Sequence, residues 1–180
     1  MTEPRIAPGS RDDLGLLTWG ATRIAGRALR TEPPKLFTIM GRHRGLLRGW
    51  LFFAGRLMPG GKLPRRDTEL VILRVAHLRD CAYEHHHHVR LGKRAGLTGA
   101  DLARVEEGPG APGWTPREEA ILTAVDELHA TGDLGDTTWQ RLQGFLSERD
   151  LIELVLLAGH YEMLATFIGT LRIAPDGPAR

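Results

Sequence analysis

Apolar residues recur every three to four positions along most of this chain of 180 residues, with polar residues between them. This spacing matches the 3.6-residue repeat of an α-helix, so the pattern predicts an all-α protein. The apolar run 71–73 is too short to indicate a strand within a helical pattern. Prolines, glycines and capping residues mark the expected helix ends. We expect helices over about 12–30, 35–58, 67–79, 81–96, 98–107, 115–130, 136–146 and 147–173.

Capping signals indicate where several of these helices begin. Thr115 and Glu118 form a capping-box pattern, with proline at the first helical position. Thr98 and Asp101 form a similar pattern, in which aspartate replaces glutamate. Single aspartates are expected to be the N-caps of three further helices, at Asp12 or Asp13, at Asp67 and at Asp80.

A loop with three glycines and two prolines over 108–113 is the expected seam within a single domain of residues 1–180. It separates a first helical half of about 35–107 from a second helical half of about 115–173. The segment Glu69–Leu73 is echoed by Glu153–Leu157, which suggests two halves related by a pseudo-twofold axis. Only the first copy is followed by reactive side chains, so we expect any site to lie in the first half.

Composition places the chain among ordinary globular proteins, with 42% hydrophobic and 26% charged residues. Its single cysteine excludes an intrachain disulfide and fits a reducing compartment. The polar N-terminus lacks the apolar region of a signal peptide, and no stretch has the ~18 uninterrupted apolar residues of a membrane span. We therefore expect a cytoplasmic protein that does not associate with membranes.

Charge is unevenly distributed along the chain. Residues 1–66 carry 13 Lys and Arg against 4 Asp and Glu, whereas the remainder carries 11 against 18. A basic N-terminal third is compatible with nucleic-acid binding. The basic residues are spread along amphipathic helices instead of forming one run, so we expect them to pack against acidic surface of this chain or of a neighbouring subunit.

The residues best suited to chemistry lie between Glu69 and His88. On one expected helix, Cys81, either Glu84 or His85, and His88 are spaced so that they share a face. Glu69 reaches the same face if the chain turns back after the preceding helix. Each residue alone also fits a structural role, for example as a small core cysteine or a surface ion pair. Their joint spacing instead points to a catalytic group in which a carboxylate orients an imidazole.

The expected charge states follow from these neighbours. We expect the imidazole of His88 to be mostly neutral at pH 7. If Asp80 is the N-cap, Cys81 lies in the first helical turn, which favours its thiolate. Two nearby carboxylates oppose that effect, so we expect a mainly protonated thiol.

The run His85–His88 also invites comparison with a metal site. Successive helical residues point about 100° apart, so at most two of these four side chains can face one ion. Only His77 and His160 are candidates for further ligands. We therefore expect no native metal ion.

The stretch RDTELVILRVAHLRDCAYEHHHHVRLGKRAGLTGADL resembles the carboxymuconolactone decarboxylase and alkylhydroperoxidase D-like superfamily. Its peroxidase branch carries Glu, eleven residues, Cys, two residues, Cys, three residues and His. This frame places Glu69, Cys81, Glu84 and His88 in the present chain. The resemblance extends over most of residues 35–173.

The chain departs from the peroxidase pattern at one position, because Glu84 stands where the second cysteine would be. It therefore cannot form the internal disulfide of a two-cysteine peroxidase. The pair Glu84 and His88 matches the decarboxylase branch, in which a carboxylate lies four residues before the histidine. The chain thus resembles a single-cysteine variant.

The resemblance implies an all-helical bundle of the alkylhydroperoxidase D-like type. It also implies a homo-oligomer (dimer, trimer or hexamer), a site near a subunit interface and no organic cofactor. Our first hypothesis is a decarboxylase- or isomerase-type enzyme for a small organic acid or lactone. In it His88 is the general acid or base, Glu69 and Glu84 orient it or hold the second proton, and Cys81 is a polar wall or auxiliary acid. Tyr83 and His85 are further expected substrate-pocket residues.

Two other functions stay open from the sequence. In the first, Cys81 reduces a hydroperoxide and an external thiol resolves the resulting sulfenic acid, which is a peroxiredoxin-type oxidoreductase activity. In the second, the chain is a non-enzymatic helical binding module, and salt-dependent retention on nucleic acid would support it. We expect a small-molecule substrate and do not expect a nucleic-acid partner.

Overall fold

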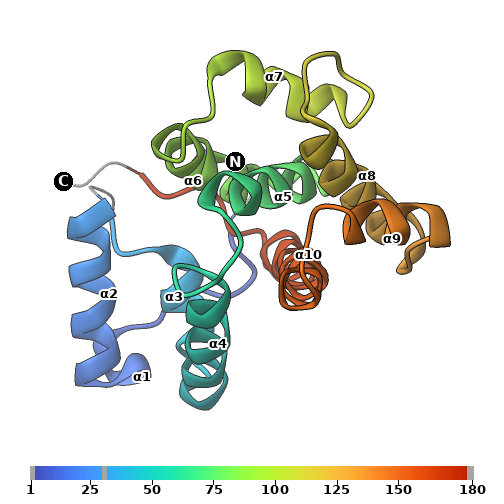
Figure 1. Cartoon of the computed structure of the whole chain (residues 1–180). Coiled ribbons are helices and arrows are strands. Elements are labelled where there is room, and N and C mark those ends of the chain that lie inside the picture. Colours follow the sequence, from blue (N-terminus) through green and yellow to red (C-terminus); the bar gives the residue numbers. More distant parts are fainter. Residues whose placement is uncertain (1–2, 30–31, 178–180) are drawn as a thin grey trace. The chain divides into compact units, whose positions relative to one another are not determined.

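The computed structural model describes residues 3–29 and 32–177 (Figure 1). Within them the chain forms ten α-helices and no strand, which confirms the predicted all-α class. The helices are α1 (Arg11–Leu14), α2 (Leu16–Leu29), α3 (Lys35–Met40), α4 (Arg44–Leu57), α5 (Arg65–Leu78), α6 (Ala82–Arg94), α7 (Gly99–Glu107), α8 (Pro116–Thr131), α9 (Asp136–Gln143) and α10 (Glu148–Leu171).

The helices divide into two compact units. The first contains residues up to Arg56 together with residues from Phe167 onward, and the second is Leu57–Thr166. Helix α10 begins in the second unit and ends in the first. The expectation of one domain over residues 1–180 stays a prediction.

The first unit begins with a shorter helix than the sequence pattern predicts. Ser10 is the N-cap of α1, and Asp13 closes its capping box, so the prediction that Asp12 or Asp13 is the N-cap is wrong. The helix ends after one turn because Gly15 has a φ of 75°, which an L-residue rarely adopts. The single helix predicted over 12–30 is therefore two helices.

The helix predicted over 35–58 is likewise interrupted, at residues 41–43 between α3 and α4. Gly41 lies against the side chain of Leu14, and a Cβ at this position would collide with it. Close packing therefore requires glycine here, and the helical pattern continues in sequence but not in structure. Within the same unit the backbone N–H of Lys35 donates to Asp176 over 2.9 Å.

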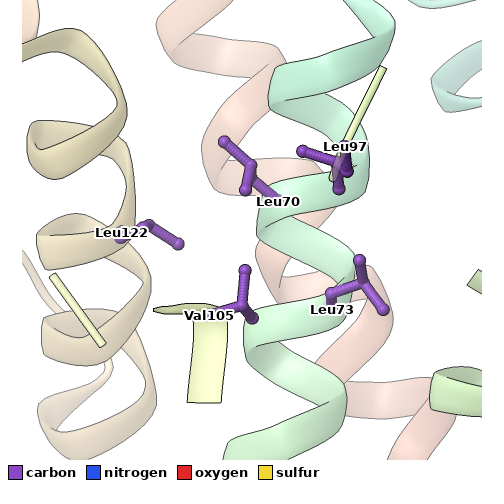
Figure 2. Packing of buried hydrophobic residues seen from close by; sticks show 5 residues of the cluster. All are labelled: Leu70, Leu73, Leu97, Val105 and Leu122. Carbon is purple, nitrogen blue, oxygen red and sulfur yellow. The ribbon is translucent and has the colours of Figure 1, made fainter. Parts of the chain in front are cut away.

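Helix α5 is the central element of the second unit. It contacts α6, α7 and α8, and residues 67–76 along it are buried. The core cluster joins Leu70 and Leu73 of α5 to residues of the surrounding segments (Figure 2). The remaining members of the cluster are Leu97, Val105 and Leu122. A helix buried on most sides gives its polar side chains fixed surroundings, which is what a site requires.

The predicted capping boxes of α7 and α8 are both confirmed. Thr98 bonds with Asp101, and Thr115 bonds with Glu118. Arg66 of α5 joins the two boxes: its Nη1 lies 3.2 Å from Asp101, and its Nε donates to Glu118 over 2.7 Å. One arginine therefore fixes the starts of two helices against α5.

The prediction that Asp67 and Asp80 are N-caps is wrong. Pro64 is the N-cap of α5, and Asp67 instead accepts a hydrogen bond from Arg117 of α8 over 2.9 Å. Cys81, and not Asp80, is the N-cap of α6. Asp80 has a φ of 47°, in the left-handed region that aspartate tolerates better than most residues.

Helices α9 and α10 begin near their predicted starts and end a few residues early. Of the described helices, only α10 has the length and composition of a membrane span, and half of its apolar window is buried within the protein. A core helix has the same properties, so this composition is weak evidence for a span.

Candidate functional site

A tight turn between α5 and α6 brings the candidate residues together. The N–H of Cys81 donates to the carbonyl of Ala76 over 2.8 Å, and that of Asp80 donates to His77 over 3.0 Å. With Asp80 left-handed, these two bonds form a Schellman motif that ends α5. The chain then returns as α6, which lies against α5 and places Glu69 beside His88.

His88 is held at both ring nitrogens. Its Nδ1 lies 2.7 Å from Oε2 of Glu69. Its Nε2 lies 3.3 Å from Oε2 of Glu84 and 3.3 Å from the hydroxyl of Tyr161 on α10. Glu69 is fully buried, and the other three are almost so. The imidazole therefore occupies a fixed orientation away from bulk water.

Glu69 is the link between this imidazole and the protein surface. Its second oxygen, Oε1, accepts a hydrogen bond from Nη2 of Arg65 over 2.8 Å. The Arg65 side chain is 43% exposed, whereas that of Glu69 is 0% exposed. A buried carboxylate needs such partners, because removing it from water without them is costly. The result is a chain of charges from Arg65 through Glu69 to His88.

The charge state of His88 differs from the sequence-based expectation. Burial by itself lowers the pKa of His88, but the hydrogen bonds and negative charges of Glu69 and Glu84 outweigh it and raise the pKa to about 9. The prediction of a mostly neutral imidazole is therefore wrong. His88 is an imidazolium at neutral pH, and it donates its Nδ1 proton to Glu69.

Cys81 lies near Glu84 and is the N-cap of α6. We expected it one position later, in the first turn of that helix. Burial raises the pKa of the Cys81 thiol, and the charge of Glu84 adds to this. The backbone N–H groups of Glu84 and Tyr83 and the charge of Arg79 oppose it. The direction agrees with the expected protonated thiol, although burial is a larger cause than the carboxylates.

The two expected pocket residues, Tyr83 and His85, differ in how far they are buried. Tyr83 is buried, and its ring centroid lies 4.7 Å from that of His87. His85 is partly exposed, and its Nε2 lies 3.8 Å from Glu106 at the end of α7. Their expected role in a pocket stays a prediction.

Among the described residues, no group of three or more His, Cys, Asp or Glu side chains is arranged to hold a metal ion. His160, a candidate ligand by sequence, is buried next to Tyr161 on α10. Burial lowers the pKa of His160, and the charge of Glu84 acts in the opposite direction. His160 therefore adds a largely uncharged imidazole to the surroundings of the site.

Sequence reasoning missed two members of the group, Arg65 and Tyr161. Arg65 is four residues before Glu69, a spacing that marks a helical ion pair and could have revealed it. Tyr161 is 73 residues from His88 in the second helical half, and no spacing rule links them. The expectation that the first half alone forms the site is therefore incomplete.

Comparison with known proteins gives a family and a fold. Residues 44–127 match the model of the carboxymuconolactone decarboxylase family. This range contains Glu69, Cys81, Glu84 and His88 but not Tyr161. No curated protein matches the chain significantly.

Several solved structures share the fold. An uncharacterized peroxidase-related protein from Ralstonia eutropha JMP134, with an alkylhydroperoxidase AhpD core, aligns with a TM-score of 0.84 at 13% identity over 97% of this chain and 93% of its own. An uncharacterized peroxidase-related protein from Silicibacter sp. TM1040 aligns with a TM-score of 0.82 at 15% identity, over 97% of this chain and 95% of its own. The debrominase Bmp8 aligns with a TM-score of 0.78 at 15% identity, over 94% of this chain and 91% of its own. At these identities the likeness establishes the AhpD-like fold alone.

Proposed function

We propose, from the match of residues 44–127 to the carboxymuconolactone decarboxylase family, a cofactor-independent enzyme for proton transfer on a small organic acid or lactone. The reaction type is a decarboxylation or an isomerisation next to a carbonyl group. The observation that carries the proposal is the geometry of His88, a buried imidazolium held between Glu69 and Glu84. Such a group is a general acid in a fixed orientation.

In a decarboxylation, the bond between the substrate carboxylate and its neighbouring carbon breaks, and carbon dioxide leaves. The electron pair stays on that carbon and is delocalised as an enolate. His88 then transfers its Nε2 proton to the carbon and becomes neutral. In an isomerisation, Glu84 removes a proton from one carbon while His88 supplies one to another. Both reactions use the Nε2 side of the ring, because Nδ1 is bound to Glu69.

The charges around His88 balance one another. Arg65 and His88 carry positive charge, and Glu69 and Glu84 carry negative charge, so the four side chains together are close to neutral. The ion pair with Arg65 stabilises Glu69 as a carboxylate, and Glu69 in turn keeps Nδ1 protonated. Arg65 and Glu69 therefore act through His88.

The test is release of carbon dioxide from carboxymuconolactone and from a panel of small β-keto acids. We expect His88→Gln to lower the rate by about 10²–10⁴-fold, the usual contribution of a general acid. His129→Gln is the matched control, because His129 forms a similar 2.7 Å pair with another glutamate, Glu162. Equal rates in the parent and His88→Gln, or no turnover of any of these compounds, would contradict the proposal.

A thiol-dependent hydroperoxide reductase is the competing function. Two of the similar structures are named peroxidase-related, and the debrominase was solved as a cysteine-to-alanine variant with 2,3,4-tribromopyrrole. In this chain, Sγ of Cys81 would attack the peroxide, the O–O bond would break, and an alcohol would leave. An external thiol would then displace water from the sulfenic acid to give a mixed disulfide.

One substitution separates the two functions. Cys81→Ser should abolish reduction of cumene hydroperoxide by dithiothreitol but leave most of the decarboxylase activity. The raised pKa of Cys81 favours the acid–base function, because a protonated thiol is a poor nucleophile. Fast peroxide reduction by the parent that is lost in Cys81→Ser would instead establish the competing function.

A further inference from the structure

Tyr161 is a buried side chain at His88 that neither the sequence motif nor the family match includes. Its hydroxyl lies 3.3 Å from Nε2 of His88, and its ring meets the imidazole edge-on with centroids 5.3 Å apart. Helix α10 supplies it, whereas α5 and α6 supply Glu69 and Glu84. The hydroxyl and the Glu84 carboxylate lie at equal distances from the same nitrogen.

These two neighbours of Nε2 differ in what they can do. A carboxylate only accepts hydrogen bonds, so Glu84 can bind the N–H of an imidazolium but cannot donate to the lone pair of a neutral imidazole. A phenol hydroxyl accepts and donates. Tyr161 is therefore the neighbour that suits Nε2 in both of its protonation states.

We propose that Tyr161 is a positioning residue that hydrogen bonds to Nε2 of His88 in both protonation states and so lets this imidazole lose and regain a proton without turning. Before proton transfer, the hydroxyl oxygen and Glu84 share the Nε2 proton. After transfer, the hydroxyl rotates and donates its hydrogen to the bare nitrogen. No atom leaves Tyr161 in this cycle, because only the direction of its hydrogen bond reverses.

The surroundings of Tyr161 keep its hydrogen in place. Burial raises the pKa of Tyr161 well above its usual value of 10, and the charges of Glu84 and Glu69 add to this, while Arg65 opposes it. The phenol therefore stays protonated while His88 titrates. Among the described residues, the titratable groups that contact His88 or its carboxylate partners include Arg65 and Glu69 from α5, Cys81 and Glu84 at the start of α6, and His160 and Tyr161 from α10.

The test is the titration of His88 followed by nuclear magnetic resonance of its ring nitrogens, assigned from the signals missing in His88→Gln. In Tyr161→Phe, neutral His88 loses its donor at Nε2 while the imidazolium keeps Glu84. We expect the midpoint to rise by roughly 0.5–1 pH unit, the size of one lost hydrogen bond. In Glu84→Gln the midpoint should fall, because a negative charge is removed. Opposite shifts separate the hydrogen bond from a general effect of repacking.

Tyr83→Phe is the matched control, since it removes the hydroxyl of the other tyrosine, whose ring lies against His87. Its His88 midpoint should equal that of the parent. An unchanged or lower midpoint in Tyr161→Phe, or the same rise in both phenylalanine variants, would overturn the proposal. Circular dichroism checks that each variant is folded.

A measurement on the parent protein does not depend on any variant. Above the midpoint, Nε2 of His88 should show the nitrogen shift of a hydrogen-bonded lone pair, and the shift of a bare lone pair would overturn the proposal. The catalytic consequence of Tyr161 rests on the proposed function, but both experiments measure protonation and not turnover. Either idea can therefore fail while the other stands.

Discussion

Burial has opposite outcomes for the two reactive side chains of the site. His88 has partners of opposite charge on two helices, so its charged form is stabilised even though it is buried. Cys81 has no such partner of comparable effect, so burial stabilises its uncharged form. The site therefore combines an imidazole whose pKa is raised with a thiol whose pKa is also raised.

The thiol gives the first prediction at the residue scale. Alkylation of Cys81 by iodoacetamide, followed against pH, should have a midpoint at or above ~8.5, the value of a free cysteine. The midpoint should fall in Glu84→Gln, because the carboxylate that repels the thiolate is gone. A parent midpoint well below that value, with rapid sulfenic-acid formation on peroxide addition, would falsify the preference for proton transfer.

Spacing predicted which acidic residues lie at His88 but not the protonation state of its imidazole. The approach of Glu69 and Glu84 follows from helical periodicity and one turn of the chain, and both depend on local sequence. The pKa depends on how completely three helices exclude water from His88, and on Tyr161 from a distant segment. Such long-range burial is not contained in a local pattern.

At the scale of the helices, capping patterns predicted starts better than single aspartates did. The boxes at Thr98 and Thr115 each combine two complementary residues, and both form. A lone aspartate has several alternatives, and Asp67 binds an arginine from another helix instead. Gly41, at the interruption between α3 and α4, lies against Leu14, 27 residues away, and periodicity does not reveal this contact.

The capping box at Asp101 predicts an acid-sensitive contact. Its pKa falls from 3.8 to about 2: burial raises it, but the hydrogen bonds of Thr98 and the hydrogen bond and charge of Arg66 outweigh this. A lowered pKa stabilises the fold above about pH 4, and this stabilisation is lost as the pH falls toward 2. Asp101→Asn should therefore lower the free energy of unfolding by roughly 2–3 kcal/mol at pH 7, from one cap and the charged hydrogen bonds of Arg66 and Arg104.

Asp150→Asn is the control for this prediction. Asp150 forms the same box with Ser147, and no arginine bond to it occurs within the described chain. This variant should lose only about 1 kcal/mol, the value of a cap. Denaturant titration at several pH values measures both. Equal losses, or a difference between the variants that is undiminished at pH 2, would show that Arg66 and Arg104 do not stabilise Asp101.

At the scale of the whole molecule, α10 presents an apolar stripe to solvent. Ile152, Val155, Leu156 and Met163 are exposed at helical spacing along one face, and Gly159 lies among them with open space around it. Exposed apolar stripes of this kind are typical of protein–protein contacts. The family resemblance implies a homo-oligomer, and we infer that a second copy of this chain covers the stripe.

This inference predicts the size of the particle in solution. The parent should be larger than its 19.9 kDa chain by light scattering at micromolar concentration. Leu156→Glu should shift the protein to the monomer, because a charge in an apolar contact is destabilising. Phe145→Glu, a similarly exposed apolar position outside the stripe, should leave the size unchanged. A monomeric parent would contradict the inference.

The Schellman motif at Asp80 also fixes how many residues separate the end of α5 from the start of α6. Each residue added to or removed from a helix start rotates the following side chains by about 100°. A one-residue insertion between Arg79 and Ala82 would thus leave every candidate side chain in the protein, yet turn His88 away from Glu69 and Tyr161. The number of residues in the turn between α5 and α6 is therefore as much a part of the site as its carboxylates and its imidazole. We expect changes in length to be tolerated in the loop over 108–113 but not in this turn.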